Sequence, residues 1–237
     1  MSNFQRYQPQ YREPVAVGRS RIAASGREKF IVRTYNHLFV AILAFAAIEA
    51  VIFMTGLNIP ITNLFAGNWM LVLGAFVIAG MVASGAAHRA ESLTSQYLAL
   101  AGYVVVEALI LVPILTTASL TAPAAIPSAG MVTVLGFAGL TAIVFYTRKD
   151  FSWLRGVVMF GGVMAIIAIV AAMIFNFALG VWFSVAMVGL AGASILYNTS
   201  NIVREYPEDR YVGAALSLFA SVAMLFFYVL RLFMSRD

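Results

Sequence analysis

The sequence predicts an all-α membrane protein, a seven-transmembrane-helix bundle with its N-terminus in the cytoplasm and its C-terminus outside. Three observations predict it. Apolar residues make up 62% of the 237 residues and charged residues only 11%, which is more apolar surface than a soluble domain of this size buries. The apolar residues gather in seven stretches of about 20 residues, the length that crosses a hydrocarbon core roughly 30 Å thick. Basic residues gather on one side of those stretches.

Each apolar stretch is expected to be a helix, because lipid offers no partner for backbone N–H and C=O groups and a helix satisfies them internally. Pro113 lies inside the third stretch and predicts a kink there. The connections are short, so the sequence predicts one compact membrane domain. The predicted spans, in chain order, are 35–57, 66–87, 96–118, 128–146, 155–177, 180–199 and 211–233.

The distribution of Lys and Arg sets the predicted orientation. Seven of these residues precede the first span, and the connections after the second, fourth and sixth spans hold one, three and two. Thirteen of the 15 therefore lie on one side, and only Arg231 and Arg236 lie on the other. Cytoplasmic segments carry the excess of basic residues in membrane proteins. An anionic leaflet accounts for these arginines, so we expect no nucleic-acid binding.

Residues 1–34 are polar and basic, and they lack the apolar core of a cleavable signal peptide. They are predicted to be a disordered cytoplasmic tail, mobile and removable without unfolding the membrane domain at 35–237. Two interpretations stay open. The tail is a handle for a partner that grips unfolded chain, or it only sets the topology.

Two glutamates fall at membrane depth, Glu107 in the middle of the third span and Glu49 in the outer half of the first. An ionisable group there is costly and faces the bundle interior or a wet cavity. Two interpretations stay open for each glutamate. It is a carboxylate that responds to protons or cations, or it is a neutral residue that only packs. For Glu107 we expect a largely neutral acid that faces inward, within reach of polar groups of the last two spans such as Ser194, Ser217 or Ser221, and that donates a hydrogen bond.

Arg89 and His88 end the second span. Arg89 is interpreted as a headgroup anchor or as a side chain that reaches inward to a helix end. His37, at the start of the first span, is expected at the interface. In the connection after the fourth span, Asp150 and Ser152 are residue types that cap a helix N-terminus.

The residue inventory excludes several kinds of enzyme. There is no cysteine, so thiolate chemistry, disulfides and iron–sulfur sites are excluded. His37 and His88 are the only histidines and form no His-Glu-x-x-His motif. Lys29 and Lys149 lie outside the spans, which excludes a retinal Schiff base within the bundle. No aspartate falls at membrane depth, so intramembrane aspartyl proteolysis is excluded too. We expect no catalytic residue, no metal and no cofactor.

Three ordered motifs carry a family resemblance. The segment FYTRKDFSWL at 145–154 closes the fourth span and opens the fifth, ILYNTSNI follows at 195–202, and AALSLF at 214–219 begins the last span. This set resembles the Bax inhibitor-1 (transmembrane Bax inhibitor motif) family, clearly over 145–233 and in span count over 35–233. The bacterial inner-membrane branch fits best. That resemblance implies a regulatory protein in the lipid bilayer that modulates, as substrate or inhibitor, a membrane-anchored AAA protease of the FtsH type.

One departure from the family pattern separates two functions. Calcium-leak members of the family pair two aspartates, and the matching positions here are Asn198 and Ser221, which do not ionise at physiological pH. Arg89 matches a basic partner of that pair and has lost its anion. The loss favours the protease modulator. The alternative is a proton- or cation-responsive leak channel or transporter that uses Glu107, with Glu49 as a second candidate.

Overall fold

The computed structural model describes the backbone of residues 16–65, 75, 78–80, 82, 85 and 92–235, and side chains from residue 26 onward. Every regular element within these ranges is a helix, so the predicted all-α class is confirmed for the described part of the chain. The helices are α1 (Ala16–Met54), α2 (Asn58–Phe65), α4 (Leu93–Thr121), α5 (Ala125–Thr147), α6 (Leu154–Phe175), α7 (Val181–Arg204) and α8 (Tyr211–Met234).

Six of these helices are long and apolar enough to cross a membrane, which makes the chain a multi-pass membrane protein. Each covers one of the predicted spans. The predicted span 66–87 lies almost wholly outside the described residues, so the count of seven stays a prediction. The short helix α2 was not predicted, and it occupies the connection after the first span. Pro113 does not end α4, which continues to Thr121.

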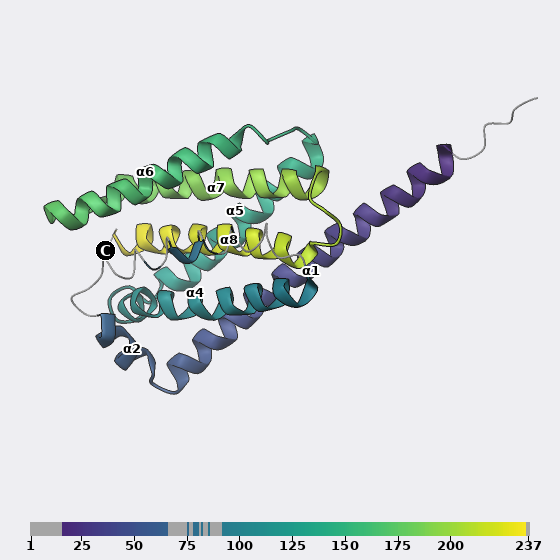
Figure 1. Ribbon diagram of the computed structural model, residues 1–237. Helices are drawn as coiled ribbons and strands as arrows, with labels where there is room; N and C mark the ends of the chain where they lie inside the picture. The colour runs from purple at the N-terminus through teal and green to yellow at the C-terminus, as the bar shows by residue number, and fades with distance from the viewer. Residues whose placement is uncertain are drawn as a thin grey trace, which may run out of the picture.

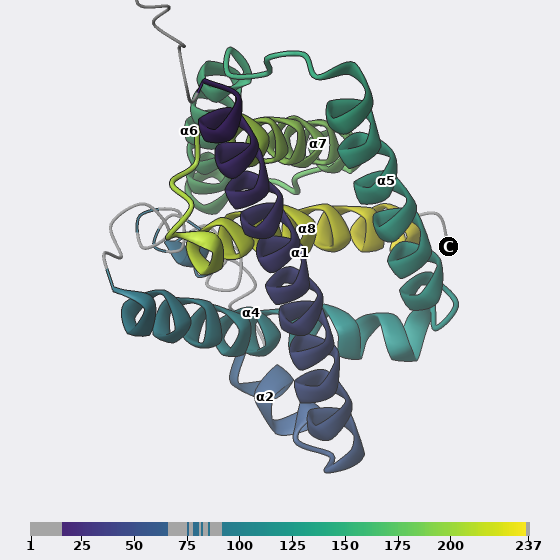
Figure 2. The ribbon, with the colours of Figure 1, turned by 90° about the vertical axis from the view of Figure 1, so that its right-hand side faces the viewer.

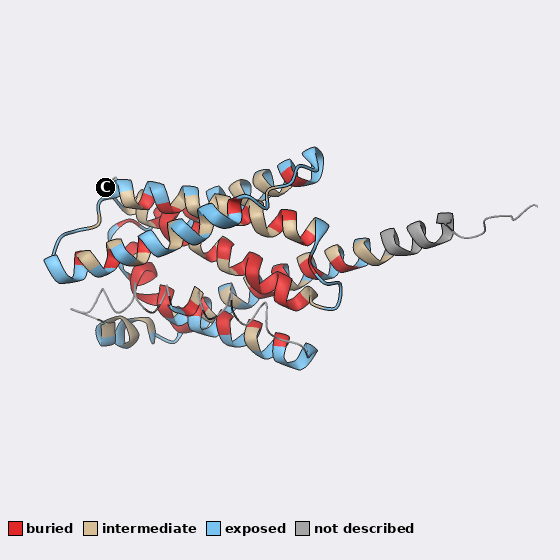
Figure 3. Ribbon diagram, turned by 45° about the horizontal axis from the view of Figure 1, so that its top comes forward, coloured by how far each residue is buried: buried red, intermediate tan, exposed pale blue. Residues whose placement is uncertain are grey.

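Helix α8 lies at the centre of the bundle (Figures 1 and 2) and packs against α1, α4, α5 and α7. Within its most apolar 18-residue window, 72% of the residues are buried, against 17% for α6. Figure 3 places buried residues along α8 and exposed ones along α6. Helix α6 therefore turns most of its apolar surface toward lipid and attaches to the rest chiefly through α7.

The sequence of α8 suits this central position. Its first turns hold the small residues Gly213, Ala214 and Ala215, which let neighbouring helices approach closely. Its second half holds the large side chains Phe227 and Tyr228, both fully buried. Lipid tails are as apolar as a protein core, so close van der Waals contact holds these helices together in place of water exclusion.

The predicted tail is too long, because α1 begins at Ala16 and is helical through the proposed boundary at residue 34. Phe30 is only 2% exposed and stacks on Tyr206 with ring centroids 6.2 Å apart. Arg27 donates a hydrogen bond to the Tyr206 carbonyl. These contacts join α1 to the α7–α8 connection, so removal of residues 1–34 is expected to damage the bundle. Residues 1–15 lie outside the described residues.

Adjacent glycines on α6 provide a test of the α6–α7 contact. A Cβ at Gly161 would lie 2.5 Å from Leu190 Cδ1 on α7, whereas a Cβ at Gly162 would meet nothing within 4 Å. Gly161→Ala should lower the free energy of unfolding by about 1 kcal/mol, because the Leu190 methyls must turn aside. Gly162→Ala should be neutral or stabilising by up to about 1 kcal/mol, since alanine favours helix. Equilibrium unfolding in mixed micelles measures both, and equal effects would contradict the packing.

Candidate functional site

A cluster of polar side chains joins α7 to α8 inside the bundle. The Asn198 amide donates to Ser221 Oγ at 2.9 Å, to Ser194 Oγ at 3.3 Å and to the Ser217 carbonyl at 3.3 Å. Ser194 Oγ and Ser221 Oγ are 2.8 Å apart. We call Ser194, Asn198, Ser217 and Ser221 the Asn198 cluster. The structure thus brings together Asn198 and Ser221, the two positions at which some relatives were expected to pair aspartates.

Helical spacing places the members of the cluster. Ser194 and Asn198 are four residues apart on α7, and Ser217 and Ser221 are four apart on α8, so each pair shares one helix face. Ser221 Oγ also donates to the Ser217 carbonyl at 3.0 Å, and Ser217 Oγ donates to the Gly213 carbonyl at 3.3 Å. Every member is neutral. The cluster therefore holds two helices together by hydrogen bonds and offers no carboxylate to a cation.

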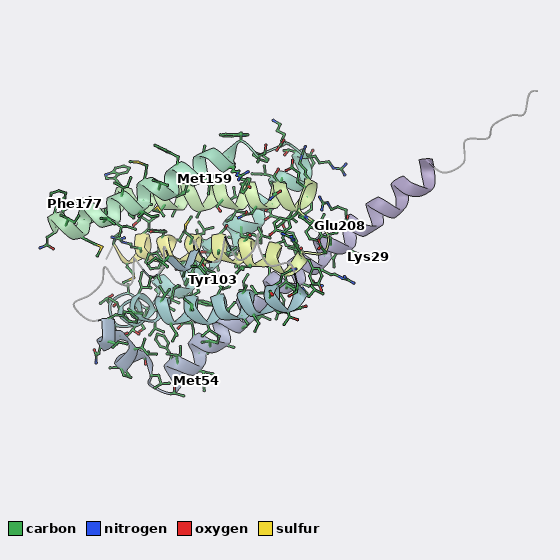
Figure 4. The ribbon with its side chains drawn as sticks, viewed as in Figure 1. Lys29, Met54, Tyr103, Met159, Phe177 and Glu208 are labelled. Atoms are coloured by element: carbon green, nitrogen blue, oxygen red, sulfur yellow. The ribbon has the colours of Figure 1, made fainter. Side chains whose placement is uncertain are left out.

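The two glutamates singled out from the sequence are buried elsewhere. Glu107 is 0% exposed and Glu49 is 7% exposed, and none of their four carboxyl oxygens has a hydrogen-bond partner among the described residues. The inward orientation expected of Glu107 is confirmed. Its expected hydrogen bond to a serine of α7 or α8 is wrong, because those serines bond within the Asn198 cluster and to their own helix. Tyr103, which Figure 4 labels in the middle of the bundle, precedes Glu107 by one turn on α4.

The histidine and arginine predictions have different outcomes. Arg89 and His88 lie outside the described residues, so both interpretations of Arg89 stay predictions. His37 Nδ1 lies 2.7 Å from the Arg33 carbonyl, and its Nε2 lies 2.8 Å from the Tyr97 hydroxyl on α4. His37 therefore ties the middle of α1 to the first turns of α4.

Sequence reasoning missed Gln96, which connects α4 to the start of α8. Its side chain is 1% exposed, accepts from the Gly213 N–H at 3.1 Å and donates to the Asp209 carbonyl at 3.3 Å. The first N–H groups of a helix have no partner within the helix. Gln96 supplies a partner for one of these N–H groups in α8. The available signal was a lone amide side chain at the edge of an apolar stretch.

A second candidate site lies where the α5–α6 connection meets the end of α7. Residues of both segments line a cavity of about 80 Å³, which we call the loop pocket. The Phe151 N–H donates to Ser200 Oγ at 3.1 Å, and Arg204 donates to the Arg148 carbonyl. These bonds fasten the connection to α7. The lining residues used below are Asp150, Ser152, Arg155, Ser200, Arg204 and Glu205.

Asp150 has a local role that differs from the expected helix cap. The N-cap of α6 is Trp153, which makes no side-chain capping bond, so the predicted cap by Asp150 or Ser152 is wrong. Asp150 Oδ1 instead accepts from the Ser152 N–H at 2.8 Å within the connection. The hydrogen bonds from the Ser152 backbone and hydroxyl, followed by the charge of Arg204, lower the pKa of Asp150. The carboxylate is therefore ionised at neutral pH.

Comparison with known proteins gives one family and several relatives. The profile described as "Inhibitor of apoptosis-promoting Bax1" matches residues 27–237. "Modulator of FtsH protease YccA" of Escherichia coli K12 is 37% identical over 122 residues, which cover 46% of this chain and 55% of YccA. Protein PA2604 of Pseudomonas aeruginosa is 37% identical over 109 residues, 46% of this chain and 49% of the relative. Protein LIFEGUARD 4 of Arabidopsis thaliana is 30% identical over 129 residues, 51% of each.

The chain spans about half the length of the curated relatives it matches. The resemblance inferred from the three motifs, including its bacterial YccA-like branch, is confirmed by these matches. YccA carries a name that assigns it to protease modulation, and that name is a statement about YccA alone.

The Asn198 cluster yields a stability prediction. Asn198→Ala and Ser221→Ala should each lower the free energy of unfolding by about 0.6–1.7 kcal/mol, the range of interhelical hydrogen bonds in membranes. The double variant should cost less than the sum, because both changes remove the same bond. The control is the double variant of Asn198→Ala with Ser128→Ala, which should be additive. The Ser128 hydroxyl bonds only to the Ala124 carbonyl of its own helix. Strict additivity of Asn198→Ala and Ser221→Ala in unfolding titrations would contradict the bond.

Proposed function

The chain belongs to the Bax inhibitor-1 family, and from that premise we propose that it is a bacterial inner-membrane regulatory protein that modulates a membrane-anchored AAA protease of the FtsH type. It would act as a substrate, an inhibitor or both. The identity to YccA over nearly half of the chain supports this choice. The zinc and ATP of such a protease belong to the partner, and no catalytic role for this chain is part of the proposal.

In the proposed topology the chain crosses the inner membrane seven times. The N-terminus is cytoplasmic, residues 66–87 form a span, and the C-terminus lies outside. The clustering of basic segments at one end of the bundle supports this orientation. Glu208 of the α7–α8 connection lies against Gly26 of α1, one turn before Lys29. The α5–α6 connection, with Arg148 and Lys149, is bonded to the end of α7. These segments carry most of the positive charge expected on the cytoplasmic side.

The observation that carries the proposal is the position of α1. Its N-terminal part projects away from the other helices (Figure 1). A protease that unfolds its substrates by pulling needs a chain end that stands clear of the folded domain. The projecting segment offers that end. The contact of Phe30 with Tyr206 comes next along the chain, so a pull would load the junction between α1 and the α7–α8 connection.

A truncation tests the proposal in membranes that contain an FtsH-type protease. Removing residues 1–15 should lengthen the lifetime of the chain, because it shortens the segment that the protease engages, while a Gly-Ser replacement of equal length should restore rapid loss. Pulse-chase labelling measures the lifetime, and affinity capture from the same membranes should recover the protease. A membrane without the protease is the control. An unchanged lifetime together with no captured protease would refute the proposal.

A second function is favoured by one observation, the burial of Glu107. Its carboxyl group is fully buried, and the side chain that interacts with it, Tyr103 one turn earlier on α4, carries no positive charge. Burial without a cationic partner disfavours the charged form of a carboxyl group. Gain or loss of a proton there would therefore change the free energy of the surrounding structure strongly. The corresponding function is a proton- or cation-responsive leak, with Glu49 as a second candidate group.

Ion flux distinguishes the two functions. Purified protein in liposomes should carry little calcium between pH 6 and 8, because Asn198 and Ser221 offer no titratable pair at the α7–α8 contact. Calcium-sensitive dye inside the liposomes measures the flux. A large flux that rises steeply with acid and disappears in Glu107→Gln, but not in the control Glu208→Gln at an exposed connection, would favour the leak over the modulator.

A further inference from the structure

The loop pocket has features that neither the protease nor the leak requires. We propose that it binds the headgroup of a zwitterionic phospholipid, in which a phosphate is joined to a primary ammonium, as in phosphatidylethanolamine. Two guanidinium groups, from Arg155 and Arg204, and two carboxylates, from Asp150 and Glu205, line the same cavity. The net formal charge of these four groups is zero, as is that of such a headgroup.

The four charged groups converge on the cavity, and the charge of Arg204 acts on Asp150 without a direct ion pair. None of them forms an ion pair with another among the described residues. Arg204 is held by the Arg148 carbonyl, and Asp150 by the Ser152 N–H. Arg155 and Glu205 make no side-chain hydrogen bond within the described structure. Ionised groups kept apart in this way retain donors and acceptors for a ligand that carries both charges.

Exposed aromatic residues flank the pocket, as expected at the depth of lipid headgroups. It is formed where α5 and α7 end and α6 begins, and Figure 2 shows the α5–α6 connection crossing one end of the bundle. Trp153 is 66% exposed and Tyr146 is 92% exposed on either side of that connection. Aromatic residues of these types mark the membrane–water interface. Val157 and Phe160, exposed on the first turns of α6, offer an apolar surface beside it for acyl chains.

The chemistry of the lining predicts selectivity among lipids. The guanidinium of Arg155 suits a phosphate, and the carboxylate of Glu205 suits an ammonium. Phosphatidylglycerol has the phosphate and lacks the ammonium. Phosphatidylcholine has a quaternary nitrogen without an N–H to donate. A cavity of about 80 Å³ has room for several water-sized groups, enough for part of a headgroup and too little for an acyl chain.

Native mass spectrometry of the full chain tests the proposal with an equimolar mixture of phosphatidylethanolamine, phosphatidylglycerol and phosphatidylcholine. Wild-type protein should retain phosphatidylethanolamine preferentially. Arg155→Gln should weaken retention of both phosphatidylethanolamine and phosphatidylglycerol by about tenfold, because the phosphate contact is lost. Glu205→Gln should weaken phosphatidylethanolamine by about tenfold and leave phosphatidylglycerol unchanged or strengthened, since only the ammonium contact is lost.

Matched controls and a soluble competitor complete the experiment. Lys149→Gln, in the connection that leads to Arg155, and Glu208→Gln, in the connection that holds Glu205, make the same charge changes at residues that do not line the pocket. Both should leave the lipid pattern as in wild type. Soluble phosphoethanolamine should compete only at far higher concentration than the lipid. Equal competition would assign the pocket to a free metabolite and overturn the lipid proposal. So would equal retention of the three lipids, or a Glu205→Gln variant that keeps its preference.

Discussion

The bundle depends on the packing of α8 against four other helices. Lipid removes the water-driven force that assembles soluble cores, so each helix pair must be held by close contact and hydrogen bonds. Helices α1, α4, α5 and α7 all meet α8, α6 attaches chiefly through α7, and α2 attaches to α4. The small residues at the start of α8 make these contacts close. Its position at the centre therefore fixes where α1, α4, α5 and α7 lie.

Polar side chains divide into two groups around this centre. Gln96 and Asn198 have their hydrogen bonds satisfied at α8, one by backbone groups at its beginning and one by serines along its face. Glu107 and Glu49 are buried with no such partners in the described ranges. The hydrogen bonds of Gln96 and Asn198 stabilise the bundle, whereas the burial of the two glutamates costs free energy. A buried group that does not help to hold the structure together is a candidate for a role in function.

The features of the fold that were predictable from sequence are those set by physical constraints on short segments. The thickness of the bilayer fixes the length of an apolar stretch, and six predicted spans match described helices within a few residues, apart from the earlier start of α1. The approach of Asn198 to Ser221 followed from a family resemblance. The start of α1, the partner of Gln96 and the loop pocket were not predictable, because each depends on residues far apart in the chain. Phe30, for example, is buried where Tyr206 of a distant connection stacks on it.

The central position of α8 has a consequence for biosynthesis. The ribosome delivers α1, α4, α5 and α7 to the membrane before α8, the helix against which all four pack. Until α8 inserts, these helices lack their common neighbour, and the side chains of Asn198 and Gln96 lack the hydrogen-bond partners that α8 supplies. Long-range contacts of this kind delay folding until late in synthesis. A nascent chain that stalls before residue 211 is therefore left in the membrane as a set of inserted helices without the central helix that joins them.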